Sequence, residues 1–167
     1  CTPVSFNPKY LEAIPEEVIE RDYGCGDPTK WVKLNDVVLD LGSGSGKNAF
    51  ICAQIVGKRG QVIGVDQNQD MLNLSRESIE YVAQKIGYKN TKFIKGSIEK
   101  LDEIDINLNP IIKDKSIDII LSNCVLNLVN PASRNNLLNN IKRVLKSNGR
   151  IAISDIVSNK KVPLELQ

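Results

Sequence analysis

The sequence predicts an α/β fold with a mainly parallel sheet and helices on both of its faces. Short runs rich in Val, Ile and Leu, typical of buried strands, alternate along the chain with longer segments of helical periodicity. Such alternation favours parallel pairing, because each helix carries the chain back to the start of the next strand. The first strand ends in a glycine-rich turn, residues 42–46, that leads into a helical segment. The length of 167 residues fits one such domain.

Residues 1–34 are expected to form an N-terminal helical arm, and residues 35–167 a core. Helices in the arm are expected to begin at Pro8 and Pro15, because proline suits the first helical position. Gly24 is a natural stop for the second of them.

The core is expected to contain five strands, at about 37–41, 61–66, 91–95, 117–122 and 150–155. A helix is expected over about 45–56, and a second one that ends at Gly87. A third helix is expected to place one apolar stripe toward the core, formed by Leu137, Leu138, Ile141, Val144 and Leu145. The segment 143–149 reads as the turn before the last strand.

Composition excludes several classes of function. The chain has no histidine, which removes Ser–His–Asp and Cys–His catalysis and the commonest zinc ligand. A net charge of +2 is too small to indicate nucleic acid or an anionic membrane as partner, and no apolar run is long enough to span a membrane. The four cysteines form no Cys-x-x-Cys pair and no signal-peptide pattern is present, so a cytoplasmic protein with free thiols is expected. Because the first residue is Cys1 and not Met, a fragment or a processed form is expected.

The spacing of the glycine turn limits its ligand. A phosphate-binding P-loop fails, because Leu41 stands in place of its first glycine and Asn48 in place of its hydroxyl. Lys47 occupies the third glycine position of the dinucleotide fingerprint, which weakens that interpretation. Asp66, at the end of the second strand, can accept hydrogen bonds from both hydroxyls of a ribose, or it can cap the helix that begins near Asn68.

Three motifs together resemble a known family. The glycine turn, Asp40-Leu41-Gly42-Ser43-Gly44-Ser45-Gly46, resembles motif I of class I S-adenosylmethionine-dependent methyltransferases. Tyr23-Gly24-Cys25-Gly26 precedes it, and Ser122-Asn123-Cys124-Val125-Leu126-Asn127-Leu128 follows later. In this order the three closely resemble arsenite methyltransferases, over nearly the whole chain. The resemblance implies a Rossmann-like class I methyltransferase fold, here truncated after strand five with the C-terminal strands missing.

The resemblance implies S-adenosyl-L-methionine as the cofactor. Asp40 can orient the amino group of this cofactor or simply fix the turn, and Met71 and Ile98 can cover the adenine faces or belong to the core. The residues expected to bind the cofactor are Tyr23, Asp40, Gly42, Gly44, Gly46, Asp66, Gln67, Met71, Ser97, Ile98 and Asn123.

The resemblance also implies a trivalent arsenic substrate, arsenite or its thiol conjugates, held by thiolates. Cys1, Cys25 and Cys124 match the arsenic-binding cysteines of the family, whereas Cys52 matches none and is expected in the core. Thiolates are the soft ligands that such a thiophilic element prefers. The arsenic lone pair can attack the sulfonium methyl group without a general base, so the lack of histidine is no obstacle. An external thiol reductant is implied for the reductive steps.

Two departures from the family and two rival interpretations stand beside this one. Asp22 stands where the family has a second tyrosine, and a further family cysteine lies beyond the point where this chain ends. A methyltransferase for a small organic molecule, of the quinone-precursor type, would share the glycine turn but would not account for the motif around Cys25. A non-catalytic cofactor-binding module is the other alternative.

Overall fold

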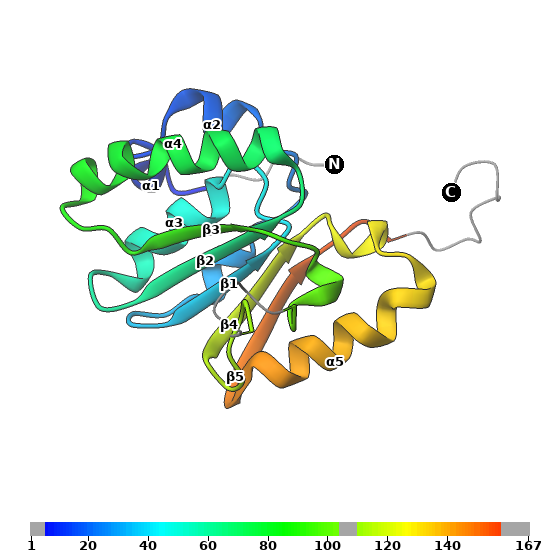
Figure 1. The fold of residues 1–167 in the computed structure, drawn as a ribbon. Coiled ribbons are helices and arrows are strands. Elements are labelled where there is room, and N and C mark those ends of the chain that lie inside the picture. Colours follow the sequence, from blue (N-terminus) through cyan, green and yellow to red (C-terminus); the bar gives the residue numbers. More distant parts are fainter. Residues whose placement is uncertain (1–5, 104–109, 158–167) are drawn as a thin grey trace.

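The computed structural model of the chain describes residues 6–103 and 110–157. Its centre is one sheet whose strands all pair in parallel, in the order β3-β2-β1-β4-β5, which confirms the predicted fold class (Figure 1). The strands are β1 (Val37–Leu41), β2 (Gln61–Asp66), β3 (Thr91–Lys95), β4 (Ile117–Asn123) and β5 (Leu145–Ser154). The strand order reverses between β1 and β4, because β2 and β3 follow on one side of β1 whereas β4 and β5 lie on the other. Ligands of open α/β sheets bind at the carboxyl ends of the strands that flank such a point.

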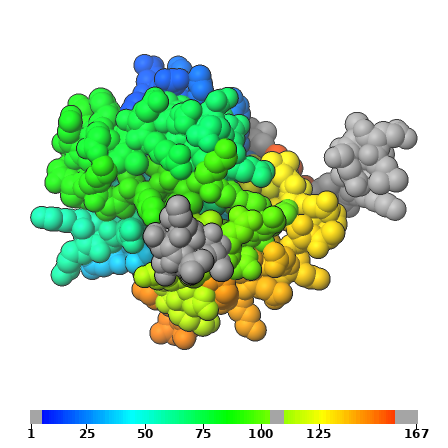
Figure 2. All heavy atoms as spheres, in the orientation of Figure 1, coloured from blue at the N-terminus to red at the C-terminus, as the bar shows by residue number. Residues whose placement is uncertain are grey.

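Helices cover both faces of the sheet, as predicted. The α-helices are α1 (Pro8–Leu11), α2 (Glu16–Glu20), α3 (Lys47–Val56), α4 (Gln69–Ile86) and α5 (Arg134–Val144). Short 3₁₀ helices are η1 (Pro28–Trp31), η2 (Ile98–Lys100), η3 (Leu126–Leu128) and η4 (Pro131–Ser133). In the space-filling view of Figure 2, α4 forms much of the upper surface and α5 part of the lower surface.

Strand β1 supplies side chains to two separate cores, because successive strand residues point to opposite faces of the sheet. Val38 joins a cluster with residues of α2, α3 and α4, among them Val18, Phe50 and Leu72. Leu39 and its neighbours on the other face pack with Leu137 and Ile141 of α5. The alternation therefore fixes which helices lie on which face.

Helix ends follow the residues that the sequence places there. The Asn68 side chain accepts hydrogen bonds from the N–H groups of Asp70 and Met71 and so caps the start of α4. At its end, Gly87 has φ 85° and its N–H donates to the Ala83 carbonyl. Both ends of α4 thus have a local cause.

The structure corrects four expectations. Helix α2 begins at Glu16 with Pro15 as its N-cap, and it ends at Glu20, before Gly24. Leu138 is 60% exposed, because it lies one residue, or about 100° around the helix, from the stripe that faces the core. The segment 143–149 is no turn: β5 begins at Leu145 and continues along β4 past a register shift.

In residues 6–103 and 110–157, no helix has both the length and the apolar character needed to cross a membrane. Strand β5 lies at one edge of the sheet, and β3 lies at the other. Two apolar side chains of β5, Ile151 and Ile153, are 46% and 50% exposed. The division into an arm, 1–34, and a core, 35–167, stays a prediction, although the described part of the arm packs on the core through Val18.

Candidate active site

The glycine turn joins β1 to α3 at the carboxyl end of the sheet. Gly42, Gly44 and Gly46 have φ values of 73°, 52° and 95°, a left-handed backbone that side chains disfavour. An added Cβ would lie 2.5 Å from Val125 at Gly42 and 2.8 Å from Phe93 at Gly46, but would meet nothing within 4 Å at Gly44. Packing therefore requires glycine at the two outer positions, and the middle position leaves open space against the backbone.

Asp66 ties the end of β2 to this turn. Its Oδ2 accepts a hydrogen bond from the N–H of Gly44 at 2.8 Å, and its Oδ1 accepts one from the N–H of Asn68 at 2.8 Å. The N-cap of α4 is Asn68, not Asp66. Asp66 contacts this capping residue through the Asn68 N–H. A carboxylate has about four acceptor sites, so the two oxygens of Asp66 retain capacity for further donors.

Two neighbouring cavities open around the turn. The first, about 280 Å³, is lined by Gly42, Asp66, Gln67, Asn68, Gly96, Ser97, Ile98, Glu99, Val125, Leu128 and Val129. The second, about 150 Å³, is lined by Arg21, Asp22, Tyr23, Gly24, Gly42, Ser43, Gly44, Ser45, Asn48, Met71, Asn123, Cys124 and Val125. Because Gly42 and Val125 line both, the two cavities adjoin.

The cavities bring together most of the residues expected from the sequence. Gly42, Asp66, Gln67, Ser97 and Ile98 share the first cavity. Tyr23, Met71, Asn123 and Cys124 line the second with Gly44. Gly46 lines neither of the two, because its missing side chain makes room for Phe93. Met71 and Ile98, both expected on the adenine, line different cavities.

Asp40 is the next-to-last residue of β1, two residues before Gly42, and is 1% exposed. Within the described part of the chain its Oδ2 has no hydrogen-bond partner. Burial, and next the carboxylates of Asp22 and Asp66, raise the pKa of Asp40 to about 7. The group is therefore protonated in mildly acidic solution, unlike an ordinary aspartate.

An ion pair that the sequence did not reveal joins the arm to the turn. The Lys47 ammonium at the start of α3 contacts the Asp22 carboxylate, and both side chains are largely buried. The same ammonium lies 4.2 Å from the centre of the Phe6 ring. Ser45 of the turn donates its hydroxyl to the Val18 carbonyl at 2.7 Å. The arm is thus held against the turn at several points.

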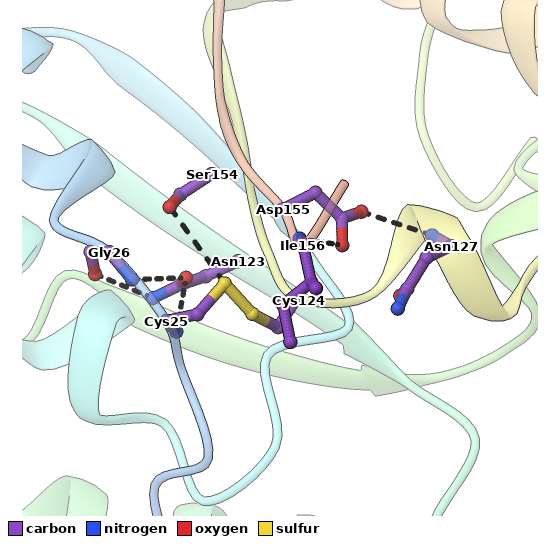
Figure 3. The surroundings of a disulfide bond; sticks show 8 residues. All are labelled: Cys25, Gly26, Asn123, Cys124, Asn127, Ser154, Asp155 and Ile156. Atoms are coloured by element: carbon purple, nitrogen blue, oxygen red, sulfur yellow. Dashed lines mark hydrogen bonds between the residues drawn. A yellow bond between two sulfur atoms is a disulfide. The ribbon is translucent and has the colours of Figure 1, made fainter. Parts of the chain in front are cut away.

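Cys25 and Cys124 lie opposite each other beside the second cavity (Figure 3). Their Cα atoms are 5.8 Å apart and their sulfurs are joined in a disulfide. The expected proximity is confirmed, and the expectation that both are free thiols is wrong for this structure, since two cysteines at this separation can bond. Among residues 6–103 and 110–157, no three His, Cys, Asp or Glu side chains form a group able to hold a metal ion.

The other two cysteines differ. Cys52 is free and buried in the core, as predicted. Burial, followed by the carboxylates of Asp40, Asp27 and Asp36, raises its pKa well above the ordinary value, so it is a poor nucleophile. Cys1 lies outside the described residues.

Sequence reasoning treated Asn68 only as the start of a helix and did not assign it to the site. Asn68 lines the first cavity and lies just after the carboxyl end of β2. That position was the available signal, because loops at these ends meet at one edge of a parallel sheet.

Comparison with known proteins places this site among methyltransferases. The family model described as "Methyltransferase domain" matches residues 32–167. The chain is 37% identical over 159 residues to the arsenite methyltransferase of Homo sapiens, a match that covers 94% of this chain and 40% of that protein. It superimposes with a TM-score of 0.85 and 35% identity on the crystal structure of an arsenic(III) S-adenosylmethionine methyltransferase from Chlamydomonas reinhardtii, covering 98% of this chain and 53% of that one. The chain therefore spans about half the length of these relatives, or less.

A shorter match bears on the alternative interpretation of the chain as a methyltransferase of the quinone-precursor type. A 2-phytyl-1,4-naphtoquinone methyltransferase of Synechococcus elongatus is 42% identical over 59 residues, which is 34% of this chain and 25% of that protein. A match that covers a third of the chain cannot include both Cys25 and Cys124, which are 99 residues apart.

Proposed function

Because the chain belongs to the methyltransferase-domain family, we propose that it binds S-adenosyl-L-methionine in the two adjoining cavities and transfers the methyl group to trivalent arsenic. The observation that carries this proposal is the placement of Cys25 and Cys124 opposite each other, with Cys124 on the wall of the cavity that contains the glycine turn. A soft dithiol beside a methyl-donor site is the arrangement that a thiophilic acceptor requires.

The residues present fit the cofactor. Gly44 leaves open space where a side chain would stand, which lets a ligand approach the backbone. Asp40 lines neither cavity, but its buried Oδ2 has no hydrogen-bond partner among the described residues, and we assign this acceptor to the cationic amino group. Asp66, whose oxygens retain acceptor capacity, is assigned to the ribose hydroxyls, and Gln67, Ser97 and Ile98 to the adenosine end. Tyr23, Met71 and Asn123 line the opposite end, near the cysteines.

The protein contributes alignment more than proton transfer. When bound, S-adenosyl-L-methionine supplies an electrophilic methyl group on a positively charged sulfur. The thiolates of Cys25 and Cys124 hold arsenic so that its lone pair faces that methyl group, and the step requires no general base. Correct alignment of two reactants is worth several kcal/mol of barrier. A third sulfur ligand comes from Cys1 or from a small thiol in solution.

The dithiol must be in its reduced form to bind arsenic. An external thiol of the glutathione class reduces the Cys25–Cys124 disulfide: two thiols of the reductant become one disulfide, and the protein gains two electrons and two protons. We place this chemistry in the cytoplasm, where thiols are kept reduced.

An arsenite titration of the reduced chain tests the proposal. Trp31, the single tryptophan, belongs to η1 and reports changes near Cys25 by its fluorescence. We expect saturable binding that is lost in Cys25→Ser and Cys124→Ser and kept in the control Cys52→Ser, whose site is buried elsewhere. Methyl transfer from labelled S-adenosyl-L-methionine to arsenite then separates an enzyme from a binding module. Arsenite binding that survives in both active-site cysteine variants would refute the assignment.

A further inference from the structure

Asn123, the last residue of β4, binds the segment that carries Cys25 through hydrogen bonds of its side chain. Its side chain is buried, at 8% exposure. The amide Oδ1 accepts hydrogen bonds from the N–H groups of Cys25 at 3.0 Å and Gly26 at 3.1 Å, and the amide Nδ2 donates to the Gly26 carbonyl at 2.9 Å (Figure 3). Every one of these three bonds goes to the backbone of one short segment, and none of them involves sulfur.

The glycines on either side of Cys25 let this segment pack closely against the side chains that end β4 and β5. A Cβ at Gly24 would lie 2.2 Å from the Asn123 Nδ2, and a Cβ at Gly26 would lie 1.8 Å from the Ser154 Oγ. Real Cβ atoms do not approach other atoms so closely, so a side chain at either position would displace its neighbour. Gly24 therefore makes room for the Asn123 amide, and Gly26 makes room for the Ser154 hydroxyl.

The opposite cysteine is also fixed through its backbone. Cys124 has φ 58°, a left-handed conformation that is uncommon for residues other than glycine. Its N–H donates to the Ser154 carbonyl at 2.8 Å, which ties it to the end of β5. The Cα atoms of the two cysteines are 5.8 Å apart, within the range at which their sulfurs can meet. The Asn123 amide on one side, the Cys124 backbone bond on the other and the disulfide itself thus hold the two cysteines at this separation.

We propose that Asn123 is a positioning residue for the cysteine pair: its amide keeps Cys25 opposite Cys124 when the disulfide is reduced. The inference rests on the proposed function only for the identity of what the dithiol then binds. We call the three hydrogen bonds between the Asn123 amide and the backbone of Cys25 and Gly26 the clasp. By holding Cys25 in place, the clasp raises the effective concentration of one thiol at the other. Two groups joined only by a flexible tether face each other at millimolar effective concentration, whereas pre-organised groups do so at much higher values.

The effective concentration is measured directly by equilibrating the full chain with mixtures of reduced and oxidised glutathione. Thiols are trapped by acid and alkylation, and the Cys25–Cys124 disulfide is quantified by peptide mass. We expect Asn123→Ala to lower the effective concentration about tenfold, which equals ~1.4 kcal/mol. Asn123→Asp keeps both acceptor contacts and loses the donor to Gly26, so we expect an intermediate value.

A second variant disturbs the same contact by a change in the Cys25 segment instead of in Asn123. Gly24→Ala places a Cβ against the Asn123 amide and should lower the effective concentration in the same direction. Asn127→Ala is the matched control, because this asparagine is exposed and uses its backbone N–H for its contact with Asp155. Circular dichroism of each reduced variant reports whether it folds, and if Asn123→Ala does not, the other two variants decide. Values within twofold of wild type in Asn123→Ala and Gly24→Ala would overturn the proposal.

The same samples separate this inference from the proposed function. If arsenite does not bind the reduced wild-type chain but the glutathione equilibrium shifts as expected, the clasp stands and the arsenic assignment fails. If arsenite binds but the equilibrium does not respond to the variants, the clasp fails and the arsenic assignment stands. If both hold, arsenite affinity should fall in parallel with the effective concentration.

Discussion

Replacing Asp40 with Asn should remove one specific pH dependence of stability. Asp40 is buried just before the glycine turn, and burial together with Asp22 and Asp66 raises its pKa to about 7 from the ordinary 3.8. Between these two values the folded protein holds a proton on Asp40 that the unfolded chain has released. Stability falls as pH rises wherever the folded state binds more protons. Below about pH 4, Asp40 therefore does not lower the unfolding free energy. Between about pH 4 and pH 7 it lowers the unfolding free energy progressively.

The magnitude follows from the shift. At 1.36 kcal/mol per pKa unit, a shift of about three units corresponds to about 4 kcal/mol at pH 8. Protonated Asp and Asn have nearly the same shape, so the two proteins should differ least at pH 4. Relative to that value, Asp40→Asn should gain about 4 kcal/mol in unfolding free energy by pH 8.

Urea denaturation of both proteins from pH 4 to pH 8 measures this difference. Asp118→Asn is a matched control, for which the stability difference from wild type should stay flat from pH 4 to pH 8 and change only in stronger acid. Burial acts to raise the pKa of Asp118, but hydrogen bonds from Lys146 and from the Val37 N–H outweigh it, and its pKa lies below the ordinary value. Asp118 therefore stabilises above its unfolded pKa and loses that contribution in acid. A stability difference between wild type and Asp40→Asn that is flat from pH 4 to pH 8 would refute the reasoning.

Three further predictions concern the same region. If the cofactor's cationic end favours ionised Asp40, its affinity measured by calorimetry should rise up to tenfold per pH unit below pH 7 and level off above, and a pH-independent affinity would exclude the contact. Asp66→Ala should weaken cofactor binding by about ten- to a hundredfold, since hydrogen bonds to a charged group are worth about 1.5–3 kcal/mol, whereas the exposed Asp70→Ala should not change it. Lys47→Met leaves the carboxylate of Asp22 buried without its partner and should lower the unfolding free energy by about 3–5 kcal/mol; a loss below 1 kcal/mol in urea denaturation would show that the pair contributes little.

Much of the fold could be predicted because its causes are local. Strand β1 and strand β2 have the predicted bounds, since runs of Val, Ile and Leu with an aspartate at or beside their last position have few other solutions. The ends of α4 followed from Asn68 and Gly87, two residues whose capping chemistry acts within one turn. The error over residues 143–149 has the opposite origin. A polar segment with a glycine looks like a turn, and only pairing with β4 makes it a strand.

In the candidate site, too, features with local causes could be predicted, whereas contacts between distant segments could not. Gly44 and Asp66 could be found because Gly44 lies in the turn just after β1 and Asp66 ends β2, and the carboxyl ends of these paired parallel strands must meet. The contacts of Lys47 with Asp22, and of Asn123 with the backbone beside Cys25, join segments 25 and 98 residues apart. No periodicity or spacing encodes such contacts, because a charge or an amide at one position is compatible with many partners. Both contacts come from the arm, so the part of the site least visible in the sequence is the part that brings the cysteine pair to the glycine turn.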